Sequence, residues 1–269
     1  MSLPRLVATD LDGTLVQPDG SISARTRRVL AAVEDRGVVV VFVTGRPLRW
    51  AEEVFEHVGE HGIAVVSNGA LVWDVHRHQV REIHAMEPRT GLEVARLIRS
   101  AIPGSAFAVE TLRGIALETA FLERHPVPEG SPRGRLEDLF DAPAVKLLAR
   151  HEELGAQEFW DRAAAVVGDR AVITWSSTSA LLEISAAGVT KASTLALLAA
   201  ELGIEAAEAV AFGDMPNDLA MLAWAGTSYA VANAHPTVLA AADHVAPSNE
   251  DDGVALTLAR IFGLDGPDA

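Results

Sequence analysis

Apolar runs and helix-like segments alternate over the first quarter of the chain. Residues 6–9 form a short apolar run, and residues 38–43 form an uninterrupted run of β-branched and aromatic residues. The second run is typical of a strand that is covered on both faces of a parallel sheet. A helical pattern with one apolar side begins at Ser23, a second helix is expected after Pro47, and residues 63–66 are predicted to form a third strand. The expected order is β-α-β-α-β.

The pattern changes after residue 68. Residues 71–73 and 80–83 flank a polar turn, which predicts a hairpin leading out of the sheet. Helices are expected near residues 92–101 and 152–167. Short strands are predicted at residues 107–109, 115–117, 145–149, 171–175 and 181–184. We interpret residues 86–186 as an inserted α+β domain with an antiparallel sheet.

The β/α alternation returns from Gly188 to the last apolar helix at residues 254–262. The predicted fold class is therefore α/β: a Rossmann-like parallel-sheet core of residues 1–85 and 187–269, interrupted by the inserted domain. Folds of this kind bind ligands at the carboxyl ends of the parallel strands.

Composition and charge narrow the possible partners. The chain has 269 residues, no cysteine and a formal net charge of -15. The absence of cysteine excludes disulfides, thiolate catalysis and cysteine-rich zinc sites, and the negative charge disfavours nucleic acid and anionic lipid as partners. No apolar run approaches the roughly 20 residues that cross a bilayer, and the N-terminus lacks the pattern of a secretory leader. We expect a cytoplasmic protein with no membrane and no nucleic-acid partner.

Polar side chains follow three of the predicted core strands, at the ends where ligands bind. They are Asp10 and Asp12 after the first strand, Thr44 after the second, and Asp214 and Asp218 after the strand at residues 209–212. Carboxylates that lie close together need a cation in order to stay ionised near neutral pH. Ligands that are all oxygen indicate a hard divalent metal, and Mg²⁺ is the metal we expect.

These residue types suit phosphoryl transfer. Asp10 could attack a phosphoryl group to give an aspartyl-phosphate, because a metal ion and the Lys191 ammonium neutralise the charges that would repel it. Asp12 could protonate the departing alcohol and later deprotonate water. The Thr44 hydroxyl and the Gly45 amide offer neutral donors to the phosphoryl oxygens, and Asp214 would complete the metal site.

Four segments of the chain together resemble the ordered motifs of the haloacid dehalogenase-like (HAD) phosphatases. They are Asp-Leu-Asp-Gly-Thr-Leu at 10–15, Thr-Gly-Arg at 44–46, Gly-Val-Thr-Lys at 188–191 and Gly-Asp-Met-Pro-Asn-Asp at 213–218. The insertion between the second and third motifs resembles the subclass with a large α/β cap domain, the Cof-like sugar-phosphate phosphatases. Residues 67–70 and 182–184 are also similar to that subclass.

The resemblance implies a role for each matching position. Asp10 would be the nucleophile and a Mg²⁺ ligand, Asp12 the acid/base with its backbone carbonyl on the metal, and Asp214 the third protein ligand. Asp218 would hold metal-bound water or orient Lys191. The residues expected to bind the phosphoryl group are Thr44, Gly45, Lys191 and Asn217. Residues 86–186 would be the cap.

The function expected from these features is a Mg²⁺-dependent phosphomonoesterase that acts on small phosphorylated metabolites, with sugar phosphates indicated by the resemblance. One alternative is a phosphosugar mutase or other phosphotransferase, which returns the phosphoryl group to a hydroxyl. Another, from a different class, is a signalling module that holds a phosphorylated aspartate without turnover.

Several residues retain a simpler interpretation. Arg46 either contacts substrate or pairs with a surface acid. Asn68-Gly69 is interpreted mainly as a hairpin-type turn, with a substrate contact as the second interpretation. Asp214, Asn217 and Asp218 are also suited to cap the helix that follows them. The histidine pairs at positions 57 and 61 and at positions 76 and 78 are not predicted to bind metal. Gly59 interrupts the helix between the first pair, the second pair lies in a polar turn, and no carboxylate or cysteine pattern completes a site.

Overall fold

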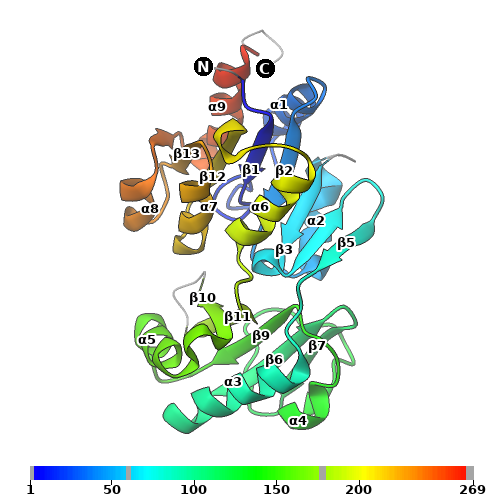
Figure 1. The fold of residues 1–269 in the computed structure, drawn as a ribbon, viewed down its shortest axis with the longest axis vertical. Helices are drawn as coiled ribbons and strands as arrows, with labels where there is room; N and C mark the ends of the chain where they lie inside the picture. Colours follow the sequence, from blue (N-terminus) through cyan, green and yellow to red (C-terminus); the bar gives the residue numbers. More distant parts are fainter. Residues whose placement is uncertain (1–2, 59–61, 176–179, 265–269) are drawn as a thin grey trace. The chain divides into compact units, whose positions relative to one another are not determined.

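The structure, a computed structural model, describes residues 3–58, 62–175 and 180–264. Contacts within the chain separate it into two units (Figure 1). The first unit contains Met1–Glu82 and Lys191–Ala269, and the second contains Ile83–Thr190.

The apolar runs of the first unit form the centre of a sheet with the strand order β14-β13-β12-β1-β2-β3-β4-β5. Its strands are β1 (Leu6–Thr9), β2 (Val39–Val43), β3 (Ile63–Val66), β4 (Leu71–Asp74), β5 (Gln79–Ile83), β12 (Ala209–Gly213), β13 (Thr227–Val231) and β14 (His244–Ala246). Pairing is parallel from β14 to β3 and antiparallel between β3 and β4. Every residue of β1 is buried, as expected for a strand with neighbours on both faces. The predicted α/β class with a parallel-sheet core is confirmed.

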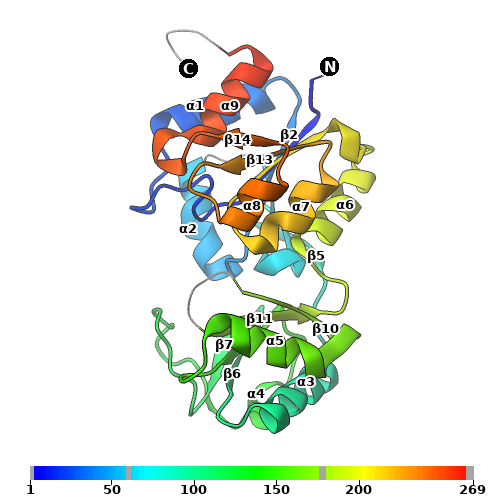
Figure 2. The same ribbon diagram turned by 90° about the vertical axis from the view of Figure 1, so that its left-hand side faces the viewer.

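Helices connect these strands. They are α1 (Ala24–Glu34), α2 (Leu48–Val58), α6 (Lys191–Glu201), α7 (Leu219–Trp224), α8 (Pro236–Ala241) and α9 (Gly253–Phe262), with short 3₁₀ turns η1 (Ser67–Gly69), η3 (Ala206–Glu208), η4 (Pro216–Asp218) and η5 (Asn249–Asp251). The side chain of Ser23 accepts a hydrogen bond from the Thr26 N–H, which fixes the predicted start of α1. Helix α1 packs against α9, and α6 packs against α7 (Figure 2).

The second unit is built on another sheet, with the order β10-β11-β9-β6-β7-β8. Its elements are α3 (Pro88–Ala101), β6 (Ala106–Thr111), β7 (Gly114–Glu118), β8 (Arg133–Gly134), α4 (Leu136–Leu139), β9 (Lys146–Arg150), α5 (Ala156–Val167), η2 (Gly168–Arg170), β10 (Ala171–Thr174) and β11 (Leu181–Ala186). The strand pairs are antiparallel except β7 with β8, which are parallel. Helices α3 and α5 pack together and share an apolar core with Phe107 and Val109 of β6. The α+β character predicted for this region is confirmed.

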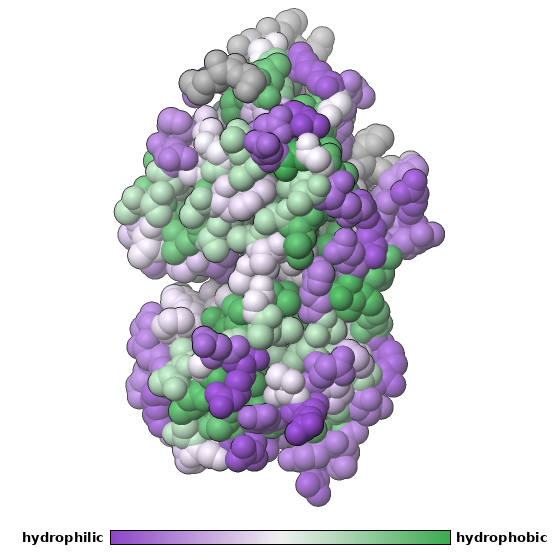
Figure 3. Space-filling view, in the orientation of Figure 1, coloured by the Kyte–Doolittle hydropathy of each residue, from purple (hydrophilic) through white to green (hydrophobic). Residues whose placement is uncertain are grey.

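Helix α3 shows how surface and core divide in the second unit. Its Gly91, Val94, Ala95 and Ile98 are buried, and hydrophilic residues are interspersed with hydrophobic ones over the face of this unit that Figure 3 displays. Among the described residues, no helix combines the length and the hydrophobicity required to cross a bilayer.

Two sequence-based predictions were wrong in detail, and three short elements were missed. The hairpin of β4 and β5 does not leave the core sheet, because β4 pairs with β3 along its whole length and so extends that sheet. Helix α5 begins at Ala156 and not at residue 152, since His151 Nδ1 accepts hydrogen bonds from the N–H groups of Glu153 and Leu154 and holds a turn there. The short elements β8, α4 and α8 were not predicted, because two to six residues carry too little periodic pattern.

Candidate active site

Three carboxylates and one ammonium group converge at the carboxyl ends of β1 and β12. Lys191 Nζ lies 2.5 Å from Asp10 Oδ1 and 2.7 Å from Asp218 Oδ1. One oxygen each from Asp10, Asp214 and Asp218 fall within 4.8 Å of one another. All four residues are buried, with Lys191 only 2% exposed. The structure therefore brings together positions that are more than 200 residues apart in the sequence.

The sheet register places these groups. Strands β1 and β12 pair with Thr9 opposite Phe212, and the Asp10 N–H donates to the Phe212 carbonyl at 3.0 Å. Both strands therefore deliver their next residues to one edge of the sheet. Asp218 precedes α7 but makes no side-chain cap hydrogen bond there; its Oδ2 instead accepts from the Asp214 and Met215 N–H groups, each at 3.1 Å.

The site is electrostatically strained by its own carboxylates. Burial, with the neighbouring charges of Asp218 and Asp214, raises the pKa of Asp10 well above its usual value, although Lys191 opposes this shift. Burial and the charge of Asp218 raise the pKa of Asp214 to about 7. For Lys191, burial acts to lower the pKa, but the charges of Asp10 and Asp218 outweigh it and the net shift is upward. Lys191 is therefore held in its charged form, whereas Asp10 and Asp214 ionise less readily than ordinary aspartates unless a further cation is bound.

A divalent metal ion fits this donor set. Three carboxylates and one ammonium leave a formal charge of two negatives, which a single divalent cation balances. All the candidate donor atoms are oxygens, which are the ligands that Mg²⁺ prefers. Asp10, Asp214 and Asp218 are the side chains that could hold it.

The carboxylate of Asp12 does not join this cluster. Arg46 Nε donates to Asp12 Oδ2 at 2.8 Å, and Arg46 Nη2 donates to Asp12 Oδ1 at 2.6 Å, so both carboxylate oxygens are engaged by one guanidinium. The hydrogen bonds that Arg46 donates to Asp12 raise the pKa of Arg46 further. Arg46 thus pairs with the expected acid/base itself, and not with an unrelated surface acid.

The loop after Asp10 packs directly on Asp214. Thr14 Oγ1 donates to Asp214 Oδ1 at 3.1 Å. Gly13 has a φ of +76°, and a Cβ at this position would lie 2.4 Å from Asp214 Oδ2. Glycine is therefore required here both by the backbone conformation and by the close approach. Sequence reasoning gave Thr14 no role, because its partner is 200 residues away.

The residues expected to bind a phosphoryl group come from three places: Thr44 and Gly45 follow β2, Asn217 lies in η4 after β12, and Lys191 begins α6. Thr44 is fully buried, and its Oγ1 accepts from the Arg46 N–H at 3.0 Å, which leaves the hydroxyl proton free to donate elsewhere. The backbone of η1 is tied to this loop, since the Asn68 N–H donates to the Thr44 carbonyl at 3.1 Å. Asn217 Nδ2 lies 3.5 Å from Asn68 Oδ1, and Asn217 Oδ1 has no hydrogen-bond partner among the described residues.

The turn at Ser67 and Asn68 is strained. Both residues have positive φ values, 52° and 57°, and both are buried. Such conformations cost free energy in residues other than glycine and concentrate at functional sites. Asn68-Gly69 therefore forms a turn, as predicted, and that turn is anchored by Thr194 Oγ1, which donates to the Gly69 carbonyl at 2.8 Å.

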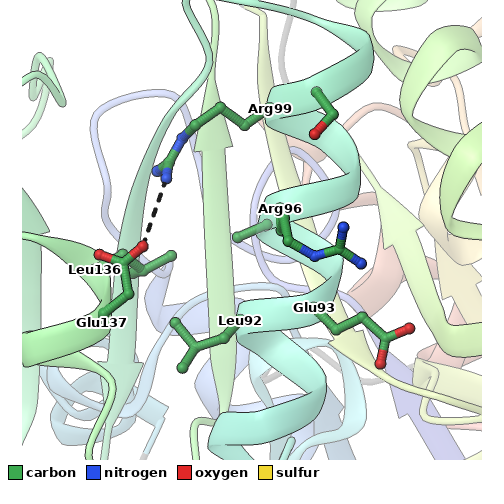
Figure 4. A pocket seen from close by; sticks show the side chains of 8 residues that line it. Leu92, Glu93, Arg96, Arg99, Leu136 and Glu137 are labelled. Carbon is green, nitrogen blue, oxygen red and sulfur yellow. Dashed lines mark ion pairs between the residues drawn. The ribbon is translucent and has the colours of Figure 1, made fainter.

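A hollow of about 440 Å³ adjoins Asp12 and Arg46 in the first unit, with Asn233 and Asn249 also in its wall. A second hollow, of about 370 Å³, lies between α3 and α4 in the second unit (Figure 4). Arg99 there faces Glu137 at 4.0 Å, and the wall contains none of the predicted site residues.

Of the histidines considered above, His78 contacts the Trp73 ring edge-on, and His61 lies outside the described residues.

A sequence profile of haloacid dehalogenase-like hydrolases matches residues 7–258. The chain belongs to this family. The resemblance recognised from the four motifs is thereby confirmed, and the match covers both units.

Individual relatives agree with this assignment. The chain is 28% identical to the 5-amino-6-(5-phospho-D-ribitylamino)uracil phosphatase YitU of Bacillus subtilis, over 97% of this chain and 98% of that one. It is 29% identical to the HMP-PP phosphatase of Serratia proteamaculans, over 86% and 85% of the two chains. Among solved structures, SMU.1108c from Streptococcus mutans superposes with a TM-score of 0.85 at 25% identity, covering 97% of this chain and 100% of that chain.

Proposed function

We propose that this HAD-family hydrolase is a Mg²⁺-dependent phosphomonoesterase that acts through an aspartyl-phosphate on Asp10. The single observation that carries the proposal is the buried contact of Lys191 Nζ with Asp10 Oδ1, 2.5 Å long, beside Asp214 and Asp218. A buried carboxylate can attack an anionic phosphoryl group only where nearby positive charge offsets the repulsion. Lys191 supplies part of that charge. A Mg²⁺ ion held by the three carboxylates would supply the rest.

The reaction has two steps at Asp10. In the first, a carboxylate oxygen of Asp10 forms a bond to phosphorus as the ester P–O bond breaks, and Asp12 gives a proton to the departing oxygen. In the second, water attacks the same phosphorus, Asp12 takes a proton from that water, and the Asp10–phosphorus bond breaks to release inorganic phosphate. Lys191, the Thr44 hydroxyl, the Gly45 amide and Asn217 would bind the phosphoryl oxygens.

Arg46 sets the orientation of Asp12 in this scheme. Its two hydrogen bonds hold the Asp12 carboxylate at the rim of the site, where the Asp12 side chain is 55% exposed. An exposed rim position suits a residue that must meet both a leaving group and a water molecule. Asp12 has to release one of these hydrogen bonds whenever it transfers a proton.

The proposed substrates are small phosphorylated metabolites, with sugar phosphates first among them. The relatives support this class, since two of them are named as phosphatases of small phosphorylated compounds and one of those compounds contains a phospho-ribityl group. We further propose that residues 86–186 act as the cap domain that selects the substrate. A net charge of -15 makes nucleic acid an unsuitable substrate.

The proposal is tested by screening phosphorylated metabolites for phosphate release in Mg²⁺ and in EDTA. We expect turnover in Mg²⁺ and its loss in EDTA. Asp10→Asn keeps the size of the side chain but removes the nucleophile, so kcat should fall by about 10³-fold or more. Asp35→Asn is the matched control, because it neutralises an exposed carboxylate of the same unit and should leave kcat unchanged.

Three outcomes would contradict the proposal. Full activity of the Asp10→Asn enzyme would exclude the aspartyl-phosphate, and full activity in EDTA would exclude the metal. In ¹⁸O-labelled water, hydrolysis places one solvent oxygen in the released phosphate, whereas a new phosphoester that carries no solvent oxygen on phosphorus, in place of free phosphate, would indicate transfer to a hydroxyl, as in a phosphotransferase.

A further inference from the structure

The segment after β13 contacts both loops that form the candidate metal site. Asn233 Nδ2 donates to the Gly13 carbonyl at 2.7 Å, and Gly13 lies in the loop that carries Asp10 and Asp12. Two residues further on, the His235 N–H donates to the Asp214 carbonyl at 2.8 Å. One short stretch of chain therefore holds the first and the fourth motif at the same time.

Asn233 is itself fixed by a second asparagine. Its Oδ1 accepts from the Asn249 N–H at 3.0 Å, so the orientation of the Asn233 amide is set by a partner on each side. Asn249 is buried, and its Nδ2 donates to the Val16 carbonyl at 2.8 Å. The two side chains thus hold the carbonyls at both sides of the Gly13–Val16 turn.

This turn reaches Asp214 through Gly13 and Thr14. The missing Cβ of Gly13 lets the backbone approach Asp214 Oδ2, and Thr14 Oγ1 donates to Asp214 Oδ1. A displacement of the turn would move the Thr14 hydroxyl away from Asp214. It would also move the backbone of Asp12, two residues from Asp10.

We propose that Asn233 is a positioning residue for the metal site, and that Asn249 supports it. By holding the Gly13 carbonyl, Asn233 fixes the distance between the loop of Asp10 and the carboxylate of Asp214, and so sets the affinity of the site for a divalent cation. This inference rests on the proposed function, because it concerns the Mg²⁺ site assigned there. Groups that orient metal ligands without touching the metal commonly change metal affinity by 10-fold to 100-fold.

The test measures Mg²⁺ binding by isothermal titration calorimetry, with no substrate present. Asn233→Ala removes both hydrogen bonds of the amide, and we expect it to raise the dissociation constant for Mg²⁺ by about 10-fold. The exposed position of Asn233 favours normal folding of this variant. Asn249→Ser, which loses the hydrogen bond to the Val16 carbonyl, is a second variant and should weaken Mg²⁺ binding in the same direction.

Ser228→Ala is the matched control, at the opposite end of β13. It removes the hydrogen bonds of Ser228 Oγ with Asp243, which are 2.8 and 3.1 Å long and lie at the end of β13 away from Asn233. This variant should lower the Tm and leave the Mg²⁺ dissociation constant unchanged. A merely structural role for Asn233 would give the same result as this control.

The outcomes separate the two proposals. If the wild type binds Mg²⁺ and folded Asn233→Ala and Asn249→Ser bind it equally well, the positioning role is overturned and the proposed function stands. If the wild type itself binds no Mg²⁺, the metal site of the proposed function is overturned, and the positioning role with it.

Discussion

Ionisation of Asp214 should destabilise the metal-free protein. Its pKa is raised from 3.8 to about 7 by burial and by Asp218. A group with a raised carboxyl pKa binds more protons in the folded state than in the unfolded state, so stability falls as the pH rises between the two values. The shift of about 3 pKa units corresponds to at most about 4 kcal/mol, at 1.36 kcal/mol for each unit. This loss of unfolding free energy is absent below about pH 4 and reaches its full size above about pH 7.

The perturbation that isolates this cost is Asp214→Asn in EDTA. The asparagine oxygen can still accept the hydrogen bond from Thr14 Oγ1, but the buried negative charge is gone. Relative to this variant, the wild type should lose up to about 3 kcal/mol of unfolding free energy between pH 5 and pH 8, because part of the full effect falls below pH 5. Urea titrations at each pH, followed by tryptophan fluorescence, measure the difference.

Added Mg²⁺ should reverse the effect in the wild type only. A cation that binds the folded state alone stabilises it in proportion to RT ln(1 + [Mg²⁺]/Kd), and it binds best when the carboxylates are ionised. The stabilisation by Mg²⁺ should therefore grow as the pH rises. Asp35→Asn controls for the loss of a carboxylate from an exposed position. The reasoning is refuted if wild type and Asp214→Asn show parallel pH profiles in EDTA.

Three further substitutions test close packing and buried hydroxyls in the first unit. Gly13→Ala places a Cβ at 2.4 Å from Asp214 Oδ2 on a backbone with φ of +76°, so the loop must shift. The value of kcat/KM should fall by about 100-fold, as expected for a displacement near 1 Å. A kcat/KM near the wild-type value in steady-state kinetics would disprove the close contact. Ser67→Ala and Thr257→Val each remove a buried hydroxyl that has no hydrogen-bond partner among the described residues. Each should raise the unfolding free energy by about 1 kcal/mol in urea titrations, and a clear decrease for either would show that its hydroxyl is hydrogen-bonded in solution.

The chain's local pattern was sufficient to predict the core and the main members of the site. Continuous apolar runs such as residues 38–43 identify buried parallel strands, and their carboxyl ends must meet at one edge of the sheet. That rule alone placed Asp10 near Asp214, and the structure has their carboxylate oxygens within 4.8 Å. The four ordered motifs then identified the family, which the match over residues 7–258 confirms.

Only the tertiary structure decided which partner each polar side chain takes. The local sequence does not show whether Arg46 pairs with a surface acid or with Asp12. The pairing depends on where two loops meet in space. The same holds for Asn233 and Gly13, which are 220 residues apart. Hydrophobic periodicity is a property of neighbouring residues and can be seen in the sequence, whereas a hydrogen bond between distant loops exists only after the sheet has brought them together.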